Sequence, residues 1–483
     1  GLGDVYKRQD YAGPIISVTG NISISQGAEI TLSSTGRNEL TLGADGSYTL
    51  MHADGTIDLG GSDRLAILLD PSSSAFKKFE NNAYLVMENG NLVLVATASK
   101  DNKYARIADT VNSRAGAELL WNLPGDLAAD SILKKVDDAV GALTSSNPSE
   151  AKRVMAAVAG STVNALGTAQ KDALRDQMGW IRNRTTLMGV NPAYVNEDLP
   201  YFHMWMEGTG SYAKLDTRGD ESGYQLTTWG GTVGMDVDLS DHFTMGAAFT
   251  ANYGSLTANA ADTADGDLDS YYVNLFARYQ SRKWSHLLIL TGGWNDAKLT
   301  RTVDYGSGSY QAHGSTTGSG FGAMYELAYD IALNEDKSVI LQPLFNASIV
   351  TTRMDGYSES GSAGNAGLRV EDQELTTAAV AVGARLSGLM GSNVFGREAL
   401  GEIRVNVSQD MGDRRGQANV GFLADPSYTR PVYGAKVGST AFQAGVGLSV
   451  PVGTQGVIFV DGNADIRSGS SSINGSIGYR YNF

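Results

Sequence analysis

The stretch that most constrains the fold is the last eleven residues, Ile473 to Phe483, because their side chains alternate between two characters. Side chains along a β-strand point to opposite faces in turn, so this stretch has one apolar, aromatic face and one polar face. Such a strand fits a half-buried antiparallel sheet in water, or the wall of a membrane barrel whose apolar face meets lipid. The apolar face consists of Ile473, Gly475, Ile477, Tyr479, Tyr481 and Phe483, and the polar face of Asn474, Ser476, Gly478, Arg480 and Asn482.

The same alternation recurs throughout the second half of the chain. Twelve alternating segments occupy the chain from Phe202 onward, and segment 283–302 is less regular because Leu287–Leu290 is apolar on both faces. Repeated alternation of this kind predicts an antiparallel barrel with an apolar outer wall and a polar lumen. The segments are about 202–216, 223–239, 243–257, 267–281, 283–302, 315–333, 337–355, 370–388, 398–412, 437–451, 455–467 and 471–483.

Connections differ at the two ends of the predicted barrel. Short polar turns alternate with long connections rich in Gly, Asp and Ser, an asymmetry typical of outer-membrane barrels with short periplasmic turns. An even number of strands places both barrel termini on the periplasmic side, so a preceding helix has to pass through the pore for earlier residues to emerge outside. The short turns are Ser240–His242, Gln280–Arg282, Asn334–Asp336 and Val452–Thr454, and the long connections are Thr257–Gly266, Asp304–Gly314, Asp355–Gly367 and Gly412–Lys436.

Before these segments, apolar residues recur at helical spacing. A first helical stretch covers about 132–143. Asn147 can then cap a helix that has Pro148 at its first position, which predicts a helix over Ser149–Leu166. Gly167 is a natural stop for this helix because glycine adopts the left-handed conformation readily.

A second helix is predicted from Ala169 to about Met188, capped by Thr168. Twenty residues span about 30 Å, close to the thickness of a hydrocarbon core. A solvated surface helix and a helix inside a polar lumen both fit its composition, and its place directly before the first barrel segment favours the lumen. Charges occupy most of its circumference, at Lys171, Asp172, Arg175, Asp176, Arg182 and Arg184, and leave an apolar stripe of Leu174, Met178, Ile181 and Leu187.

Short apolar-alternating pieces separated by Gly, Asn and Asp fill residues 14 to about 98. Strands this short and numerous predict a stacked solenoid, although a small β-sandwich would give a similar pattern. Asn89-Gly90 predicts a two-residue hairpin turn. Gly1–Gln9 do not match the character of this region and are interpreted as translated adapter sequence, with a genuine loop as the alternative. Because the chain starts without Met and shows no secretory signal, we expect a carboxyl-terminal piece of a longer protein.

Composition excludes several classes of function. The 483 residues include no cysteine, which removes disulfides, thiolate metal sites and thiol catalysis. A formal charge of −15 argues against nucleic acid as a partner. The mean hydropathy of −0.18 and the lack of a long apolar run argue against a membrane-spanning helix. They do not argue against a barrel, whose alternating strands average out in hydropathy.

Together these features resemble type V autotransporters, whose chain ends in a twelve-stranded translocator barrel. The resemblance covers nearly the whole chain and implies an all-β fold, in which a 12-stranded antiparallel transmembrane β-barrel with a luminal α-helix comes after a β-helix (solenoid) passenger remnant. The expected boundaries are 1–9 for the adapter sequence, 10–100 for the passenger end, 101–167 for a helical junction, 168–190 for the plug helix and 196–483 for the barrel.

The resemblance also implies a function. Such a barrel lies in the bacterial outer membrane, carries its own N-terminal passenger to the cell surface and anchors it there, without a cofactor or metal. Expected partners are the outer-membrane lipid bilayer, periplasmic chaperones and the barrel-assembly machinery, which would recognise Tyr479, Tyr481 and Phe483, and the protein is expected to be a monomer. In self-cleaving members an Asn pair in the helix attacks the chain. Asp172-Ala173 stands at that place here, so we expect the passenger to stay attached.

Charged residues on the polar faces of the segments are expected to point into the lumen. We expect them to pair with one another and with the charges of the helix, and so to hold the helix in the pore. Simple solvation of these charges by luminal water is an equally good interpretation. They are Asp236, Asp238, Arg278, Arg385, Glu402, Arg404, Asp461, Asp465, Arg467 and Arg480.

Two other functions stay open. A barrel enzyme of the protease or lipase type would place a histidine with Ser or Asp at the outer rim, where His313 is near Ser309 and Asp304. An adhesin would bind host ligands through its loops, and Arg218-Gly219-Asp220 in the first outer loop is a candidate. A solvated loop histidine and a chance tripeptide are the simpler interpretations, so no catalytic residue is predicted.

Overall fold

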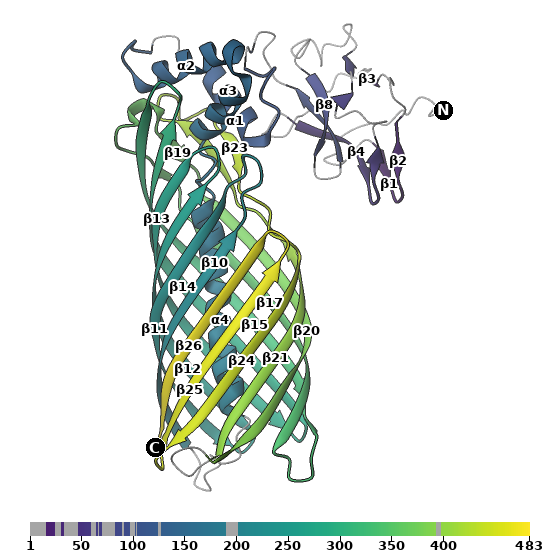
Figure 1. The fold of residues 1–483 in the computed structure, drawn as a ribbon, viewed down its shortest axis with the longest axis vertical. Coiled ribbons are helices and arrows are strands. Elements are labelled where there is room, and N and C mark those ends of the chain that lie inside the picture. Colours follow the sequence, from purple (N-terminus) through teal and green to yellow (C-terminus); the bar gives the residue numbers. More distant parts are fainter. Residues whose placement is uncertain are drawn as a thin grey trace.

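The computed structural model describes residues 16–24, 30–32, 47–58, 64–65, 67–69, 83–88, 91–96, 102, 104–123, 127–189, 201–392 and 398–483. These residues form a tall β-barrel with a helix in its lumen, a group of helices within 104–158 that covers one end of the barrel, here called the cap, and a small β unit towards the N-terminus (Figure 1). The expected adapter sequence at 1–9 and the Asn89-Gly90 turn lie outside the described residues.

Twelve strands close the barrel, which confirms the predicted fold class. They are β10 (Tyr201–Leu215), β11 (Gly223–Ser240), β12 (Phe243–Asn259), β13 (Thr263–Ser281), β14 (Trp284–Asp304), β15 (Ser309–Tyr329), β17 (Val339–Met354), β20 (Gln373–Ser392), β21 (Glu398–Gly412), β24 (Thr440–Val452), β25 (Gly456–Arg467) and β26 (Ser470–Asn482). Each strand pairs antiparallel with its neighbours, and the first strand, β10, pairs with the last, β26. A two-residue strand, β16 (Ile331–Ala332), only continues β15.

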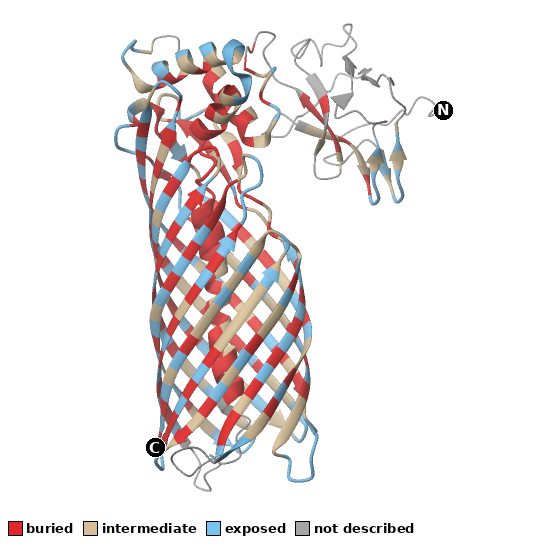
Figure 2. Cartoon of the chain, viewed as in Figure 1, coloured by how far each residue is buried: buried red, intermediate tan, exposed pale blue. Residues whose placement is uncertain are grey.

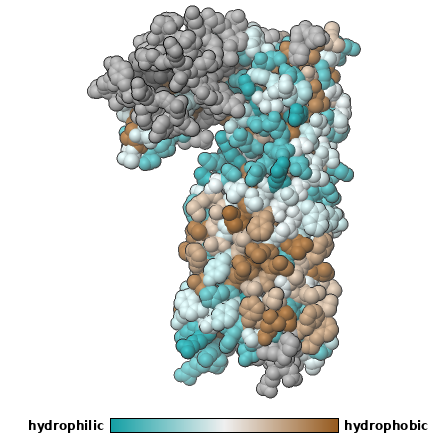
Figure 3. Space-filling view, turned by 180° about the vertical axis from the view of Figure 1, so that it is seen from behind, coloured by the Kyte–Doolittle hydropathy of each residue, from teal (hydrophilic) through white to brown (hydrophobic). Residues whose placement is uncertain are grey.

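The outer wall of the barrel is apolar, and buried and exposed residues alternate along each strand (Figure 2). Trp229, Val382 and Ile477 point outward and are 65%, 61% and 61% exposed. Apolar side chains gather over the lower part of the wall, below a hydrophilic upper part (Figure 3). An apolar belt of this kind suits a hydrocarbon environment.

Aromatic rings border the apolar belt at both ends, as they do in outer-membrane barrels. We name the rings at the cap end the outer girdle. The ring pairs are Trp229–Tyr253 (centroids 5.0 Å apart) and Tyr271–Trp294 (5.8 Å) in the outer girdle, and Phe202–Phe483 (5.6 Å) and Trp284–Tyr329 (4.8 Å) at the opposite end.

The strands at the cap end are longer than predicted. Residues 257–266, expected to form a loop, belong to β12 and β13 except for a turn at 260–262, and most of 304–314 belongs to β14 and β15. Their small and polar side chains stay in register, so the wall continues above the belt as a hydrophilic extension. The other two long connections contribute a separate four-stranded sheet of β18 (Tyr357–Ser358), β19 (Leu368–Val370), β22 (Gln417–Phe422) and β23 (Arg430–Tyr433).

The helices are α1 (Val111–Trp121), α2 (Ile132–Ser146), α3 (Pro148–Val158) and α4 (Ala165–Gly189). Asn147 caps α3 as predicted, since its side chain accepts a hydrogen bond from the Glu150 amide at 3.3 Å. The predicted stop at Gly167 is wrong because that residue lies inside α4. The chain instead turns after α3 at Gly160, whose φ of 80° is left-handed. Among the helices in the described ranges, none has the length and hydropathy needed to cross a bilayer.

The described residues of the N-terminal β unit form three parallel and three antiparallel strand pairs, and one of the antiparallel pairs is a hairpin. The hairpin of β8 (Ala83–Glu88) and β9 (Asn91–Ala96) agrees with the sequence prediction. Parallel pairing of successive short strands is what a solenoid needs, but each pair covers only two or three residues, so the β-helix stays a prediction. The parallel pairs are β1 (Ile16–Val18) with β4 (Ser47–Ala53), β2 (Ile22–Ser23) with β5 (Ile57–Asp58), and β3 (Ile30–Leu32) with β7 (Ile67–Leu69).

Candidate functional site

Helix α4 runs through the lumen of the barrel, with its N-terminal end at the cap (Figure 1). Its apolar stripe of Leu174, Met178 and Ile181 packs against inward-facing apolar residues of the wall, including Leu287 and Ile289 of β14. The lumen is therefore polar on only part of its circumference, which corrects the prediction of a polar lumen throughout. This packing also explains the irregular alternation of β14. One face of the strand contacts the apolar stripe of α4 and the other face belongs to the apolar belt, so both faces are apolar.

The remaining circumference of α4 carries charges that meet the wall in three groups of ion pairs. The upper group, near the cap, joins the first turns of the helix to β21 and β25. It consists of Arg175–Asp410 (2.9 Å), Arg467–Asp410, Arg467–Asp465 (2.7 Å) and Lys171–Asp172 (3.1 Å), with the Tyr224 hydroxyl donating a hydrogen bond to Asp172.

The middle group is a chain of alternating charges across neighbouring strands. Three arginines and three carboxylates take part, so the group is neutral as a whole, which is the condition for burying so many charges. Asn183 of the helix also joins it, by donating a hydrogen bond to Asp461 at 3.0 Å. The pairs are Arg182–Glu326 (3.9 Å), Arg385–Glu326 (2.6 Å), Arg385–Glu402 (3.5 Å), Arg404–Glu402 (2.5 Å) and Arg404–Asp461.

The lower group holds the C-terminal part of the helix. Arg184 is 2% exposed and pairs with Asp236, which lies 3.6 Å from Arg480 of the last strand. The Arg184 guanidinium also stacks 3.9 Å above the ring of Trp205. A buried guanidinium that pairs with a carboxylate and also stacks on an aromatic ring is strongly bound. The two contacts take the place of the water that is excluded from the site.

The cap is fused to the barrel mouth through a buried charged cluster centred on Arg301 of β14. Its guanidinium is fully buried and pairs with Asp262 at 2.8 Å and with Glu359 at 2.6 Å. It also donates a hydrogen bond to the carbonyl oxygen of Ala157 in α3 at 3.1 Å. Asp262 in turn accepts hydrogen bonds from Ser161 and Thr162, which connect α3 to α4.

One hydrophobic core contains residues of the cap and of the outer connections together. Val136, Met155 and Val163 from the helical segment share it with Val420 and Val432 from the β21–β24 connection. Arg153 of α3 adds hydrogen bonds to the carbonyl oxygens of Ala261 and Asp304. The cap and the outer connections of the barrel therefore fold together around one shared core.

A family model described as the autotransporter beta-domain matches residues 204–463. The chain belongs to the autotransporter family. Its barrel accordingly lies in the bacterial outer membrane, with the cap end outside and the short turns in the periplasm.

The chain is similar to several known proteins over part of its length. Esterase EstA of Pseudomonas aeruginosa is 32% identical over 181 residues, which cover 37% of this chain and 26% of the relative. An extracellular serine protease of Serratia marcescens is 26% identical over 187 residues, covering 38% and 17%. The chain therefore spans about a quarter or less of these curated relatives. The translocator domain of the autotransporter NalP from Neisseria meningitidis aligns over 67% of this chain and 99% of its own, with 17% identity and a TM-score of 0.48.

The luminal charges predicted from the sequence lie in the barrel wall around helix α4 or on the helix itself. All ten wall residues are buried or half-buried, and the ion pairs described above include eight of them. Arg278 donates a hydrogen bond to Gln280 at 3.4 Å. Asp238 pairs with the buried His203 at 3.0 Å. Of the six helix charges, Asp176 lines a small luminal cavity, and the other five pair as described above.

Sequence reasoning missed two luminal carboxylates that pair with arginines of α4, Glu326 and Asp410. Asp410 lies inside the predicted segment 398–412, on the same face as the predicted Glu402 and Arg404, so the alternation of that segment points to it. Glu326 comes after a run of glycines and small residues in β15, where the polar face gives little signal. Tyr479, Tyr481 and Phe483 face outward at the end of the last strand, and their role as an assembly signal stays a prediction.

At the two alternative sites, the described residues make contacts other than those of a catalytic or adhesive site. The Nδ1 atom of His313 contacts the hydroxyl of Thr300 at 3.0 Å, and no described contact joins the imidazole to Ser309 or Asp304. The tripeptide at 218–220 does lie in the first outer loop, but the Asp220 carboxylate accepts a hydrogen bond from the Ser113 amide at 2.9 Å. The Asp220 carboxylate thus binds the first turn of α1 and helps to attach the cap to the first outer loop.

Proposed function

We propose that this barrel carries the chain segment that precedes it to the cell surface and keeps that segment anchored there. The supporting observation is the path of the chain. Helix α4 passes through the lumen and continues directly, through Gly160, into helices that pack on the outer mouth. A barrel whose two ends lie in the periplasm can present preceding residues outside only by such a path.

We further propose that residues 10–100 are the end of a solenoid passenger and that the passenger is not released by the helix itself. The parallel pairs of the N-terminal unit support the first point. The second rests on Asp172, which stands where self-cleaving relatives are expected to carry an asparagine. Its carboxylate is engaged by Lys171 and by the Tyr224 hydroxyl, which suits an anchor better than a nucleophile.

The test is an epitope tag at the N-terminus of the chain, expressed behind a signal peptide. We expect antibody to bind the tag on intact cells, and tag and barrel to migrate as one polypeptide. The matched control carries the same tag at Glu335, in an exposed periplasmic turn, where antibody should bind only after the outer membrane is permeabilised. The proposal is wrong if both tags need permeabilisation, and the anchoring part is wrong if a fragment starting at Ala173 appears.

A second candidate, enzymatic activity in the longer protein, is favoured by the names of two relatives, an esterase and a serine protease. We propose that any such activity resides in the part that precedes this chain, because His313 contacts only a threonine hydroxyl among the side chains described. The folded chain should hydrolyse p-nitrophenyl butyrate no faster than the buffer does, with or without His313→Ala. Hydrolysis that disappears with His313→Ala would show a rim enzyme instead.

A further inference from the structure

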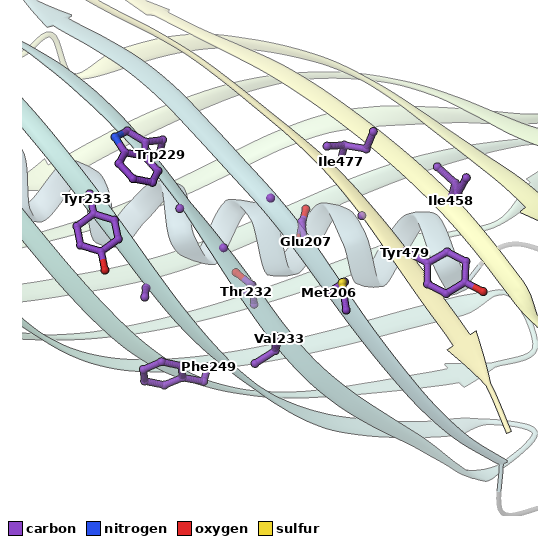
Figure 4. A pocket seen from close by; sticks show the side chains of 15 residues that line it. Met206, Glu207, Trp229, Thr232, Val233, Phe249, Tyr253, Ile458, Ile477 and Tyr479 are labelled. Carbon is purple, nitrogen blue, oxygen red and sulfur yellow. The ribbon is translucent and has the colours of Figure 1, made fainter.

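The first and last strands of the barrel meet at a seam, where Met206 of β10 lies beside Tyr479 of β26 (Figure 4). At the outer end of this seam, the amide of Asp216 donates a hydrogen bond to the carbonyl oxygen of Gly469 at 2.8 Å. A Cβ atom on Gly469 would lie 2.6 Å from the Arg218 guanidinium, so glycine lets this cation pack against the turn. The rim of the barrel therefore places Arg218 at the outer end of the seam.

Three more cations lie near Arg218 and come from the connection between β21 and β24. Together they form what we name the basic cluster, which consists of Arg218, Arg414, Arg415 and Lys436. Burial lowers the pKa of Lys436, and the charges of Arg414 and Arg415 lower it further. Arg218 acts in the same direction, and Glu221 acts against it. A lysine among arginines is electrostatically unfavourable, and an anion bound there would relieve this repulsion.

Backbone hydrogen bonds hold the basic cluster in place. The Val437 amide donates to the carbonyl oxygen of Arg414 at 2.8 Å, which keeps Lys436 beside it. The Ala435 amide donates to the carbonyl oxygen of Ser222 at 2.9 Å and thereby ties the connection to the first outer loop. These contacts leave the cationic side chains available, so the cluster is already arranged before a ligand arrives.

Helix α1 of the cap bridges the same two segments. The side-chain amide of Asn112 donates hydrogen bonds to the carbonyl oxygens of Asp220 at 2.8 Å and of Tyr433 at 2.9 Å. A ligand that joins the two segments through the basic cluster would therefore also stabilise the attachment of α1 to the barrel mouth.

The basic cluster carries more positive charge than its neighbours neutralise. Arg415 pairs with Glu221 at 3.1 Å and stacks 4.0 Å above the ring of Tyr433. The side chains of Arg218, Arg414 and Lys436 make no ion pair or hydrogen bond with the residues that the structure describes. Three cations thus stand without a paired carboxylate, although the whole chain has a net charge of −15. The carboxylates beside the cluster bind other groups, namely Asp216 with Lys214 (2.9 Å), Asp220 with the Ser113 amide (2.9 Å) and Asp413 with the Thr376 amide (2.9 Å).

We propose that the basic cluster binds a phosphate group at the cell surface, either free in solution or carried by a larger molecule such as an outer-leaflet lipid. A guanidinium donates two parallel hydrogen bonds to phosphate oxygens, and the ammonium of a lysine adds a compact charge. A phosphate group that carries two negative charges comes close to balancing the three cations. A single carboxylate would leave most of their charge uncompensated.

Isothermal titration calorimetry of the folded chain in non-ionic detergent, with inorganic phosphate as the probe, tests the proposal. We expect saturable binding at constant ionic strength. The double variant Arg414→Gln with Lys436→Gln should weaken it by about tenfold or more, because hydrogen bonds between charged groups are strong. Arg218→Gln, in the other segment, should also weaken it. The matched control is Lys298→Gln with Arg353→Gln, which removes two exposed cations elsewhere on the rim and should bind like the wild type.

A second arm identifies the source of the phosphate by native mass spectrometry with lipopolysaccharide, before and after phosphatase treatment. Retention of the intact lipid alone, lost in the double variant, would assign the site to a phosphate carried by lipid. Retention of neither lipid, with inorganic phosphate bound, would assign it to free phosphate. Equal binding of every probe by the wild type and the double variant would overturn the proposal. Displacement of phosphate by chloride at equal ionic strength would overturn it too, and so would a wild type that binds no probe.

Two further measurements accompany the titration. Inorganic phosphate should slow amide hydrogen exchange of α1 in the wild type and not in the double variant, because α1 rests on both segments. Heat-modifiable migration checks that each variant is a folded barrel, and Arg218→Gln decides the result if the double variant does not fold. These outcomes do not depend on where the N-terminal tag is found, so the secretion proposal is tested separately.

Discussion

Replacing Arg301 by methionine is expected to release the cap from the barrel mouth. The substitution removes the cation that pairs with two buried carboxylates, Asp262 and Glu359, and also removes a donor to the last turn of α3. Breaking a buried pair by deleting one partner costs about 3–5 kcal/mol, because a charge stays buried without compensation. Amide hydrogen exchange of α1 and α3 in detergent should accelerate by the corresponding factor, while the barrel strands stay protected.

The control for this result is Arg353→Met. Arg353 pairs with Asp372, but both side chains are more than half exposed, so water screens the pair and its loss should leave the exchange rates unchanged. A triple variant, Arg301→Met with Asp262→Asn and Glu359→Gln, should recover part of the lost stability because it leaves no uncompensated charge. Exchange at the wild-type rate in Arg301→Met would show that the hydrophobic core alone holds the cap.

The second large effect is expected at the opposite end of the lumen, for Arg184→Ala. This change removes the hydrogen-bonded partner of Asp236, which keeps only the more distant Arg480 at 3.6 Å, and it also removes the stacking on Trp205. Together these losses should cost about 3 kcal/mol, the lower end of the range for breaking a buried pair. The C-terminal turns of α4 should then leave the wall far more often. At about 1.4 kcal/mol per tenfold change, the population of the open pore should rise about a hundredfold or more. Single-channel recordings in planar bilayers measure this population directly.

Arg182→Ala is the matched control for the pore measurement. It removes the same number of atoms from the same helix, but Arg182 has its nearest carboxylate at 3.9 Å, and Glu326 keeps Arg385 as a partner. We therefore expect a much smaller rise in open events. Equal conductance of Arg184→Ala and the wild type would mean that the apolar stripe, and not the charges, keeps the helix in place.

The alternation of the strands could be predicted from the sequence because it is a local property of each segment. It places Trp229 towards lipid and Asp236 towards the lumen correctly, and it gives the number of strands. The positions at which the strands end could not be predicted from this alternation. Around Asn259 and Asp304 the residues are typical of turns, but pairing across long hairpins overrides that local preference.

Tertiary contacts also explain the errors in the helical region. Helix α1 lies within the predicted helical junction at 101–167, but its bounds were not predicted, because Asn112 and Gly116 are poor helix formers. In the structure, a Cβ atom on Gly116 would lie 1.8 Å from the Met155 carbonyl oxygen, so the glycine permits the close approach of α1 to α3. Gly160 and Gly167 are equally good helix stops by sequence. Packing of Gly160 against Leu368 and Arg301 decides between them.

Ion-pair partners were the least predictable part of the site. Residues such as Arg385 and Glu326 are far apart in sequence and meet only when the barrel closes around the helix. A single sequence shows that inward charges exist and that their signs are mixed. It does not show which ones touch, since that depends on strand register and on the rotation of α4.

The shared core of the cap has a practical consequence for engineering. A foreign cargo grafted directly onto α4 would leave Val420, Val432 and Phe422 of the outer connections without the helices that cover them. Cell-surface display through this barrel therefore calls for a fusion point upstream of Tyr104. A cargo joined there keeps the barrel's own helical lid, and the display host is spared an exposed, aggregation-prone hydrophobic surface.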